Sequence, residues 1–505
     1  MLIKEINLFE FQKYNWDYIF DDLAIKNNKD LFKEHFEEIL QMIWIDRYNY
    51  IPNENLYNNS TSKDQRFFEI TSLFIKPKNY TGSIEFKFEE ILYRFNILPK
   101  IFYIDSYSYQ NEHYNSIQLH TLWWLSEIID IIPPSYQTSL DELNTTNIIE
   151  IYIYLFSSFT LQILENDSYK YYNDINEDLN TIKGKINFTN YINNYTKGSH
   201  HIINCDFDDF TVDNQFNQII KYVTNLVKPY TSNRYTIQKL NDILFILDDV
   251  SDVQVISSDC DKVILNAIFS EYKTILDYCR LFLNGTTSYS NHHKYDVFAL
   301  IIPTEKLFEK LIRKFCNEID DKNFKGIITK RPGRGYLAEE IMPDYSKENR
   351  FKLVNDIIIK TEDDYIIIDT KYKTLNESEK DKGIKQTDMY QMVGYAISSG
   401  IKSIKLIYPS KIFGTSAIIS NYTINDLFTL DTHILVNALQ IKIISTEPFS
   451  IKLEHETLEN IFKKLKNEII LDLKHLILNK EARTYTLDSN HIAIQNVAEQ
   501  KSDYN

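Results

Sequence analysis

Residues 355–391 read NDIIIKTEDDYIIIDTKYKTLNESEKDKGIKQTDMYQ, and two apolar, β-branched runs in this segment predict a hairpin of buried strands between Ile357 and Ile368. Asp356 opens the first run, Asp369 ends the second, and Lys371 lies two residues further on. Because alternate residues of a strand share a face, Asp369 and Lys371 should point the same way, with Asp356 beside them. Two carboxylates and an ammonium group can hold a divalent cation and a polarised water, which suits phosphodiester hydrolysis.

A D/E-x-K spacing is common by chance, so the weight of this one comes from its context. Charged groups at the end of a buried strand are costly to place unless they meet a partner or a metal. A literal Pro-Asp pair, Pro343-Asp344, is a rival for the first metal ligand, but it precedes a charged loop. We favour Asp356, because it leads directly into an apolar run and lies 13 residues before Asp369, a natural distance for a two-strand hairpin.

The chain continues with a polar stretch and then a predicted helix, Thr387–Ala396, whose apolar residues recur at helical spacing. Ile404–Pro409 follows as a further strand, so the order of elements is that of an α/β core. Gln391 lies in the N-terminal part of the helix. It either contacts the scissile phosphate or orients the attacking water, or it is an ordinary glutamine on the helix surface.

This segment resembles the core of the PD-(D/E)xK nuclease superfamily, with Asn355-Asp356 in place of the usual Pro-Asp. The residues DTKYK, a helix with YQM-x-x-Y-A and a strand ending in LIYP resemble, more narrowly, the McrC family. Members of this family are the nuclease subunits of McrBC-type, GTP-dependent restriction systems that act on modified DNA. Further segments agree with the family in its order, and the resemblance covers roughly residues 65–450: Ile97–Ile101, Lys183–Phe188, Cys205–Asn217 and Leu307–Ile312.

The resemblance implies a multidomain α+β and α/β chain. A β-rich and helical partner-docking region would precede a C-terminal PD-(D/E)xK restriction-endonuclease-like domain. Composition shifts and turn-rich segments predict five parts. They are an N-terminal helical extension and linker (1–64), a β-rich module (65–140), a mainly helical McrC-like middle region (141–288), the nuclease domain (289–450) and a C-terminal helix with a polar tail (451–505).

On this resemblance the chain is expected to be a Mg²⁺-dependent DNA endonuclease, with Mn²⁺ as an alternative ion. Asp356 and Asp369 would bind the metal together with the backbone carbonyl of Thr370. Lys371 would position or deprotonate the attacking water, and Gln391 would help to orient it.

Two further sets of residues have an open role. Glu309, on a predicted helix ahead of the sheet, is either another metal ligand, as in many related nucleases, or an ordinary surface glutamate. Lys330, Arg331 and Arg334 form a basic stretch just ahead of the hairpin, which either contacts DNA or is a solvated loop.

The sequence contains neither a GxxxxGK[ST] phosphate loop nor a GxGxxG motif, so the chain is not expected to bind or hydrolyse a nucleotide alone. The family implies a separate McrB-like AAA+ GTPase hexamer as partner and double-stranded DNA as substrate. The N-terminal half would dock onto that ring and stimulate it. One alternative is an assembly factor with a weak nuclease. Another is a sequence-specific subunit in which residues 1–140 read DNA directly.

A net charge of −16 argues against a protein that coats nucleic acid over its whole surface. Four scattered cysteines without a CxxC pair predict buried thiols in a reducing compartment. His200-His201 and His292-His293 lack ligand partners at suitable spacing and are predicted to lie at the surface. With no signal-peptide pattern and no long apolar window, we expect a cytoplasmic protein without membrane contact.

Overall fold

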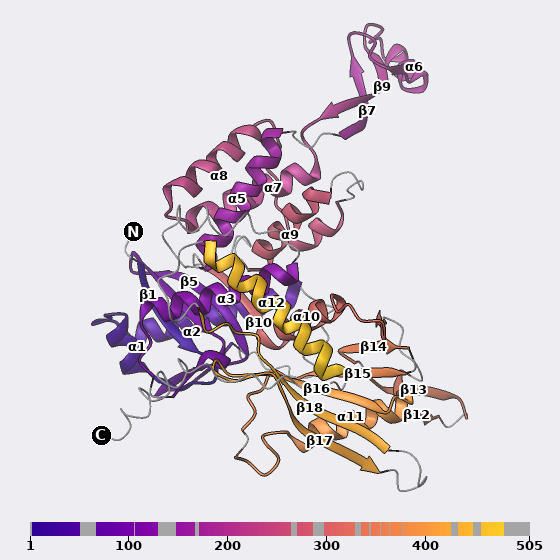
Figure 1. Ribbon diagram of the computed structural model, residues 1–505. Helices are drawn as coiled ribbons and strands as arrows, with labels where there is room; N and C mark the ends of the chain where they lie inside the picture. Colours follow the sequence, from indigo (N-terminus) through magenta and orange to yellow (C-terminus); the bar gives the residue numbers. More distant parts are fainter. Residues whose placement is uncertain are drawn as a thin grey trace. The chain divides into compact units, whose positions relative to one another are not determined.

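Figure 1 shows a computed structural model of the 505-residue chain. It is a mixed α and β protein with two compact units, one formed by Met1–Leu40, Asp64–Asp130 and Ile301–Asn505 and the other by Gln41–Lys63 and Ile131–Leu300. The structure describes residues 3–50, 67–105, 107–129, 148–166, 171–263, 270–285, 297–328, 335–342, 345–353, 355–362, 364–376, 378–425, 433–447 and 456–478. Among these, no helix has both the length and the apolar character needed to cross a bilayer. The five-part division of the chain stays a prediction.

The first unit contains a four-stranded sheet with the strand order β1-β6-β5-β10. Its strands are β1 (Ile3–Phe9), β5 (Tyr80–Phe88), β6 (Ile91–Leu98) and β10 (Val297–Pro303), and the boundary between the units falls within β10. Strand β1 runs parallel to β6, whereas β5 runs antiparallel to it. The helical spacing predicted for the N-terminal segment is therefore wrong for Ile3–Phe9. There Ile6 and Leu8 are buried, and the period is two rather than 3.6.

Helices α1 (Trp16–Asp22) and α2 (Lys29–Tyr50) follow β1 in the chain. Phe36 of α2 stacks on Phe95 of β6 with ring centroids 4.5 Å apart, and Phe32 packs edge-on against neighbouring aromatic rings of the sheet. These aromatic contacts form the core of the N-terminal part. A small sheet with the order β2-β4-β3 completes it, from strands β2 (Tyr14–Asn15), β3 (Phe68–Ile70) and β4 (Phe74–Pro77).

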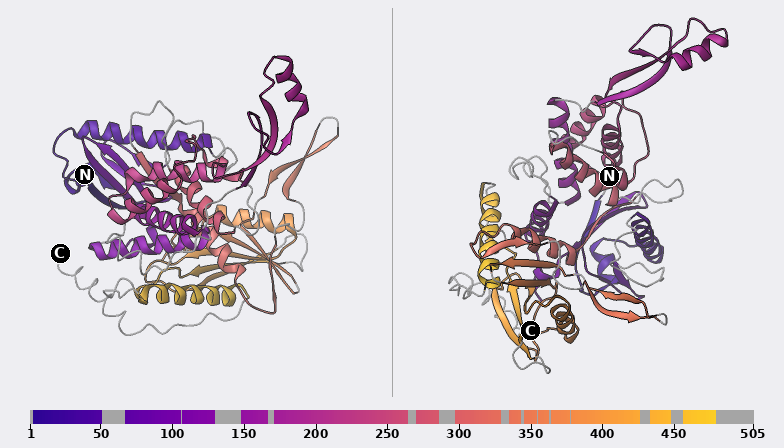
Figure 2. Two further views of the ribbon diagram at one scale, coloured as in Figure 1. Left: turned by 90° about the horizontal axis from the view of Figure 1, so that it is seen from above. Right: turned by 90° about the vertical axis from the view of Figure 1, so that its right-hand side faces the viewer.

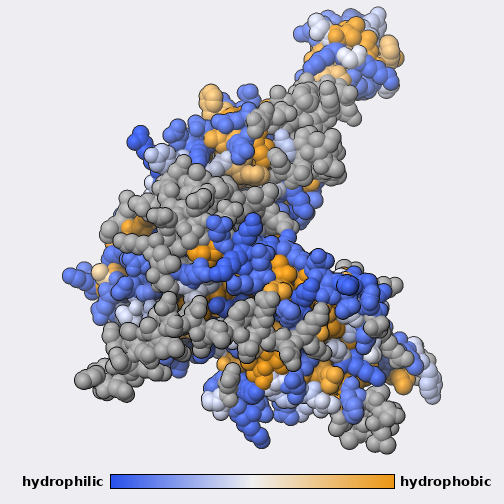
Figure 3. Space-filling view, in the orientation of Figure 1, coloured by the Kyte–Doolittle hydropathy of each residue, from blue (hydrophilic) through white to orange (hydrophobic). Residues whose placement is uncertain are grey.

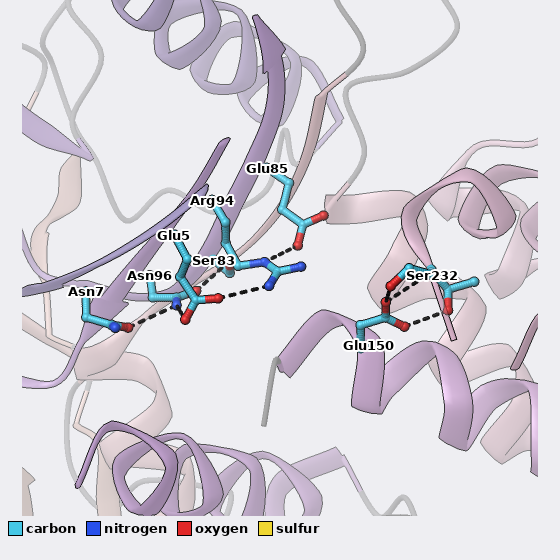
Figure 4. Close-up of polar contacts among 9 residues, drawn as sticks. Glu5, Asn7, Ser83, Glu85, Arg94, Asn96, Glu150 and Ser232 are labelled. Atoms are coloured by element: carbon cyan, nitrogen blue, oxygen red, sulfur yellow. Dashed lines mark hydrogen bonds and ion pairs between the residues drawn. The ribbon is translucent and has the colours of Figure 1, made fainter. Parts of the chain in front are cut away.

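One face of the four-stranded sheet carries a charged network around the buried Arg94 and Glu85, shown in Figure 4. Arg94 lies opposite Glu5 and Glu85 in the strand register. Its Nη1 donates to Glu5 Oε2 at 2.9 Å and its Nε donates to Glu85 Oε1 at 2.5 Å. Asn96, two residues along β6, donates to Glu5 Oε1 at 3.0 Å. Each of these charged groups therefore meets an opposite charge or an amide.

The same unit contains a six-stranded sheet with the order β11-β14-β15-β16-β18-β17. Its strands are β11 (Phe324–Ile327), β14 (Ile357–Thr361), β15 (Tyr365–Thr370), β16 (Ser403–Pro409), β17 (Ala417–Asn425) and β18 (His433–Ile441). Strands β14 and β15 form the predicted hairpin, with Ile357 opposite Ile368. Strands β15, β16 and β18 are parallel, so the sheet is mixed. The apolar runs are buried because helices cover both faces.

Figure 2 shows the six-stranded sheet between helix α11 (Gln386–Ser399) and helix α12 (Glu456–Ile477). On the α11 side, Met392, Tyr395 and Ala396 join a buried cluster with isoleucines and leucines of the strands. Helices α10 (Thr304–Asn317) and α12 pack together, and Trp123 of α3 (Asn111–Ile129) stacks on Phe462 at 5.1 Å. An exposed two-stranded hairpin extends beside α11, formed by β12 (Tyr336–Ile341) and β13 (Lys347–Lys352).

The second unit is built mainly on helices. They are α5 (Ile148–Asn166), α7 (Gln215–Val227), α8 (Arg234–Ile246) and α9 (Ser270–Gly285), with short 3₁₀ turns η2 (Lys228–Tyr230) and η3 (Ser257–Asp261). Glu150 of α5 accepts hydrogen bonds from the Thr231 hydroxyl at 2.6 Å and from the Ser232 amide at 2.8 Å (Figure 4). This buried carboxylate ties α5 to the turn between α7 and α8.

A long hairpin extends from these helices (Figure 1). It consists of β7 (Tyr171–Leu179), β8 (Lys185–Ile186), helix α6 (Phe188–Thr196) and β9 (Ile203–Thr211). Gly184, at the start of the GKINF motif, has φ +71°, and a Cβ there would lie 2.5 Å from the Asp206 carbonyl oxygen. Only glycine permits this close approach without strain.

Candidate active site

The hairpin β14–β15 brings Asp356 next to the end of β15. Asp356 Oδ2 accepts hydrogen bonds from the Thr370 amide at 2.7 Å and from the Thr370 hydroxyl at 2.9 Å. Arg313 of α10 donates to the Asp356 backbone carbonyl. Thr370 thus holds the carboxylate of Asp356, and the helix holds its backbone. Asp344, the rival first ligand, lies outside the described residues.

Asp369 is the most deeply buried charged group of the site, with 1% of its surface exposed. Burial raises the pKa of its carboxyl to about 7, and the nearby Asp356 adds to this while Lys371 opposes it. Lys371 Nζ contacts Asp369 Oδ2 at 2.6 Å as an ion pair. Two carboxylates therefore share a site with one ammonium group, and the site favours additional positive charge.

Lys371 also donates to Gln391 Oε1 at 3.0 Å, and Gln391 Nε2 donates to the Tyr395 hydroxyl at 2.5 Å. Burial opposes the charge of Lys371, but the carboxylates of Asp369 and Asp356 outweigh it and raise its pKa. Lys371 is therefore a stable cation, held between a carboxylate and an amide. The structure thus brings together the four residues singled out from sequence, and Tyr395 joins them through Gln391.

Sequence reasoning missed a second ion pair beside the first. Lys373 Nζ donates to both carboxylate oxygens of Asp388, at 2.9 and 2.8 Å. Asp388 is buried in the first turn of α11, three residues before Gln391. The pair therefore ties the start of α11 to the chain that leaves β15. A signal was present, because Lys373 follows Lys371 by two residues and Asp388 lies one turn before Gln391 on the same face of the helix.

Tyr372, between the two lysines, points away from the site. Its side chain is 3% exposed and its ring lies 6.0 Å from that of Phe308. The Lys373 amide bonds back to the Lys371 carbonyl, and this turn leaves the Tyr372 ring beside Phe308 while the Lys371 side chain pairs with Asp369.

Glu309 is close to the site but engaged elsewhere. Its Oε2 pairs with Lys306 Nζ at 2.5 Å, one turn before it on α10. The pKa of Lys306 is raised: burial opposes this, while Glu309 and, more weakly, Asp356 favour it. Lys306 therefore lies in the electrostatic field of both carboxylates, which sequence reasoning missed. A metal-ligating role of Glu309 stays a prediction.

Other predicted residues have mixed outcomes. The basic residues Lys330, Arg331 and Arg334 and the pair His292-His293 lie outside the described residues. His200 and His201 are exposed, as predicted. All four cysteines are buried free thiols. Over the ranges that the structure describes, no group of three or more His, Cys, Asp or Glu side chains could hold a metal ion by itself.

Comparison with known proteins identifies relatives of this chain. Residues 75–409 match the family described as "McrBC 5-methylcytosine restriction system component". A chain in the refined half-complex of Thermococcus gammatolerans McrB AAA+ hexamers with bound McrC aligns with a TM-score of 0.58 and 14% identity, covering 92% of this chain and 100% of that one. A chain of the cryo-EM structure of the Thermococcus gammatolerans McrBC complex aligns with a TM-score of 0.46 and 15% identity, covering 63% and 89%.

No curated protein matches the chain. At 14% identity, the likeness to the first structure concerns the fold, which is of mixed α and β type in both. The family match shows more than a common fold, because residues 75–409 are well over half of the 505-residue chain. The chain belongs to the McrBC family of 5-methylcytosine restriction system components.

Proposed function

We propose that this chain is the nuclease subunit of a McrBC-like restriction system, a PD-(D/E)xK endonuclease that cuts double-stranded DNA when assembled with an AAA+ GTPase. The observation that carries this proposal is the convergence of Asp356, Asp369, Lys371 and Gln391 on one end of the β14–β15 hairpin. A carboxylate pair and a lysine on adjacent strands form the site that metal-dependent phosphodiester hydrolysis requires.

The donor set fits Mg²⁺. The carboxylate of Asp369 is 1% exposed and has a single lysine partner, and the carboxylate of Asp356 lies near it. Mg²⁺ is typically bound through one or two carboxylates, with water and substrate phosphate completing its octahedron. Asp356 and Asp369 would hold the ion, with the Thr370 carbonyl as third protein ligand and Mn²⁺ as an alternative. The bound ion would neutralise charge on the phosphate and acidify a water.

The remaining side chains act on the water and the phosphate. Lys371, kept cationic by Asp369, offsets charge that develops on the phosphate and positions the water. Gln391 holds the lysine through its Oε1 and orients the water. The Tyr395 hydroxyl in turn fixes the Gln391 amide, so that its oxygen and not its nitrogen faces the lysine.

A cleavage assay tests the nuclease assignment. The full chain, with its co-expressed AAA+ partner, GTP and Mg²⁺, should cut methylated plasmid DNA, and EDTA should abolish cutting. Lys371→Met should remove cleavage while the protein stays folded. Lys474→Met is the matched control, because Lys474 pairs with Asp321 on another part of the same unit. Cleavage by Lys371→Met at the rate of the control would refute the assignment.

The second unit supports the proposal that the chain docks onto its partner. In helix α6, Phe188, Ile192 and Tyr195 lie at spacings of four and three and are 66%, 57% and 55% exposed. They form one apolar face, and apolar atoms gather at this end of the hairpin in Figure 3. The opposite face is polar, and it is the polar face that packs on β9. An amphipathic helix ordinarily packs the other way round.

The polar face of α6 is held by a set of amide hydrogen bonds. Asn190 Nδ2 donates to Asn204 Oδ1 at 3.2 Å, and Asn194 Nδ2 and Asn204 Nδ2 both donate to Asp178 Oδ1, at 2.8 and 2.7 Å. Asn187 donates to Asp206. Because these bonds fix the orientation of α6, its apolar face is left for another molecule. We assign that face to the AAA+ partner.

A GTPase assay separates the two proposed activities. The chain should stimulate the GTPase activity of its AAA+ partner. Stimulation should persist in Asp369→Asn, because the β7–β9 hairpin with α6 belongs to the second unit and Asp369 to the first. Stimulation without any metal-dependent cleavage in the wild type would favour an assembly factor over a nuclease. Loss of stimulation in Asp369→Asn would contradict the division of roles.

A further inference from the structure

Lys100 lies far from the nuclease motif in sequence but directly behind it in the structure. It begins the 3₁₀ turn η1 (Lys100–Phe102), which follows β6. Its Nζ donates to the backbone carbonyl of Tyr372 at 2.7 Å, across 272 positions of sequence. The same ammonium lies over the rings of Tyr372, at 4.4 Å, and Phe11, at 4.5 Å. Lys100 is thus fixed against the residue that follows Lys371.

A buried carboxylate holds this lysine in place. Glu10, at the end of β1, is 0% exposed, and its Oε2 accepts a hydrogen bond from the Lys100 amide at 3.0 Å. Thr304 Oγ1, at the start of α10, donates to Glu10 Oε1 at 2.5 Å. Burial raises the pKa of Glu10 to about 7, and Lys100 opposes this rise. Three distant segments of the chain therefore meet at Glu10, and Lys100 links them to the backbone of Tyr372.

That backbone is the point where β15 ends and the site begins. The Lys371 amide donates to the Ile407 carbonyl at 2.9 Å, beyond the last residue of β15, and the Lys373 amide donates back to the Lys371 carbonyl at 2.8 Å. The chain thus turns sharply across Tyr372. Its carbonyl is held by Lys100, a side chain, instead of continuing a strand ladder. A turn held this way depends on that donor for its orientation.

We infer that Lys100 is a positioning residue of the nuclease site: by holding the Tyr372 carbonyl, it sets the direction in which Lys371 points. This inference rests on the proposed nuclease function. It also means that the N-terminal sheet, through Glu10 and Lys100, is a structural part of the site and not a separable module. Lys100 itself is on the far side of the turn and contacts no reacting group.

The test uses the full chain with its AAA+ partner, GTP, Mg²⁺ and methylated duplex DNA. Lys100→Met keeps the aliphatic stem and removes the donor, so kcat should fall by about 10- to 100-fold with little change in KM, as for a misplaced catalytic group. Lys100→Arg, which can donate to the same carbonyl, should restore most of kcat. Lys466→Met is the matched control, since Lys466 pairs with Glu127 and Glu318 away from the site in the same unit.

A second measurement needs no cleavage. Amide hydrogen exchange of a peptide covering residues 369–376 should be faster in Lys100→Met than in the wild type and unchanged in Lys466→Met. If Lys100→Met unfolds the chain, the double variant Glu10→Gln/Lys100→Met, which also removes the buried carboxylate charge, takes its place. Unchanged exchange, or loss of kcat equal in Lys100→Met and Lys466→Met, would overturn the inference. If the wild type does not cleave DNA, the nuclease proposal fails while the exchange result still decides whether Lys100 holds the turn.

Discussion

The end of the β14–β15 hairpin and the helix α6 depart from the usual distribution of side chains in opposite directions. The first buries charge: Asp369 is 1% exposed, with a second carboxylate beside it. The second exposes apolar surface: Phe188 is 66% exposed, while asparagines face the strand beneath it. Buried polar groups and exposed apolar patches are the informative exceptions in a folded protein. The buried carboxylates favour a bound cation, and the exposed apolar face of α6 favours a protein partner.

The network around Arg94 shows that buried charge alone does not mark a site (Figure 4). Glu85 is as deeply buried as Asp369, yet a guanidinium between two carboxylates bonds to both. At the proposed nuclease site the pKa of Asp369 is raised to about 7 despite its lysine partner. Both places have two carboxylates around one cation, but Arg94 bonds to both of its carboxylates, whereas Lys371 pairs with Asp369 while Asp356 bonds to Thr370.

The largest effect should come from Asp369→Asn. Loss of one metal-binding carboxylate should lower DNA cleavage by at least about 10³-fold. In EDTA the same change should raise the midpoint of thermal unfolding, because it removes a buried charge whose ionisation the fold opposes. Activity assays and melting curves at pH 8 check both. A variant that loses activity and stability together would mean that Asp369 is merely a structural residue.

Arg94→Met should have the converse effect, a loss of stability without a specific loss of chemistry. It leaves Glu85 buried without its guanidinium partner, which typically costs about 3–5 kcal/mol. Urea unfolding measures this cost, and amide hydrogen exchange in β5 and β6 locates it. The double variant Arg94→Met/Glu85→Gln should recover part of the loss. If the single variant were as stable as the wild type, pairing would not be what separates this network from the nuclease site.

His120 is a buried histidine, and both of its ring nitrogens are hydrogen-bonded when the ring is neutral. Its Nδ1 bonds to the Ser116 carbonyl at 2.7 Å, and its Nε2 accepts from the Ser445 amide at 3.0 Å. Burial lowers its pKa from 6.5 to about 4. Between these pH values the unfolded chain binds a proton that the folded chain does not, so stability should fall as pH drops from 6.5 to 4.

The loss from His120 should reach about 3 kcal/mol near pH 4. Urea midpoints of the wild type and His120→Gln across this pH range measure it, because the other acidic groups are common to both. An identical pH slope in the two proteins would show that His120 is not the cause.

The smallest of these effects should come from helix α6 in the β7–β9 hairpin. Phe188→Ser/Ile192→Ser removes apolar area from α6 without removing a bond that holds the helix. Half-maximal stimulation of the partner GTPase should require about 10-fold more chain, while the unfolding midpoint stays the same. Leu73→Ser, a change at a residue 74% exposed in the other unit, is the control. Equal stimulation by all three proteins would exclude the apolar face of α6 as the docking surface.

Sequence alone predicted the local parts of the site well. The hairpin, the helix around Gln391 and the strand after it lie where their periodicities place them, with α11 beginning at Gln386 and β16 at Ser403. These are contacts within one segment, where alternation and helical spacing determine which side chains share a face. The catalytic roles assigned to these residues stay predictions.

Sequence could not predict what reaches the site from elsewhere. The Lys100–Tyr372 contact spans 272 positions, and no spacing rule connects such residues. Periodicity also identifies an apolar face on α6 but not the direction in which it points, which depends on the asparagines that bind β9. The β1 strand was missed because seven residues with period two, next to two helices, are too short to stand out.

The bond from the Lys371 amide to the Ile407 carbonyl has a consequence for biosynthesis. Strand β16 is parallel to β15, so the two strands are joined by a crossover through α11. The chain must therefore be synthesised through α11 and to the end of β16 before that bond can form. A ribosome that has translated the whole DTKYK motif has therefore produced no site. Parallel pairing between segments distant in sequence is also slow. The time between synthesis of the DTKYK motif and formation of the site is therefore longer still. A nascent chain beside nucleic acid thus carries Asp356, Asp369 and Lys371 without the arrangement needed to cut.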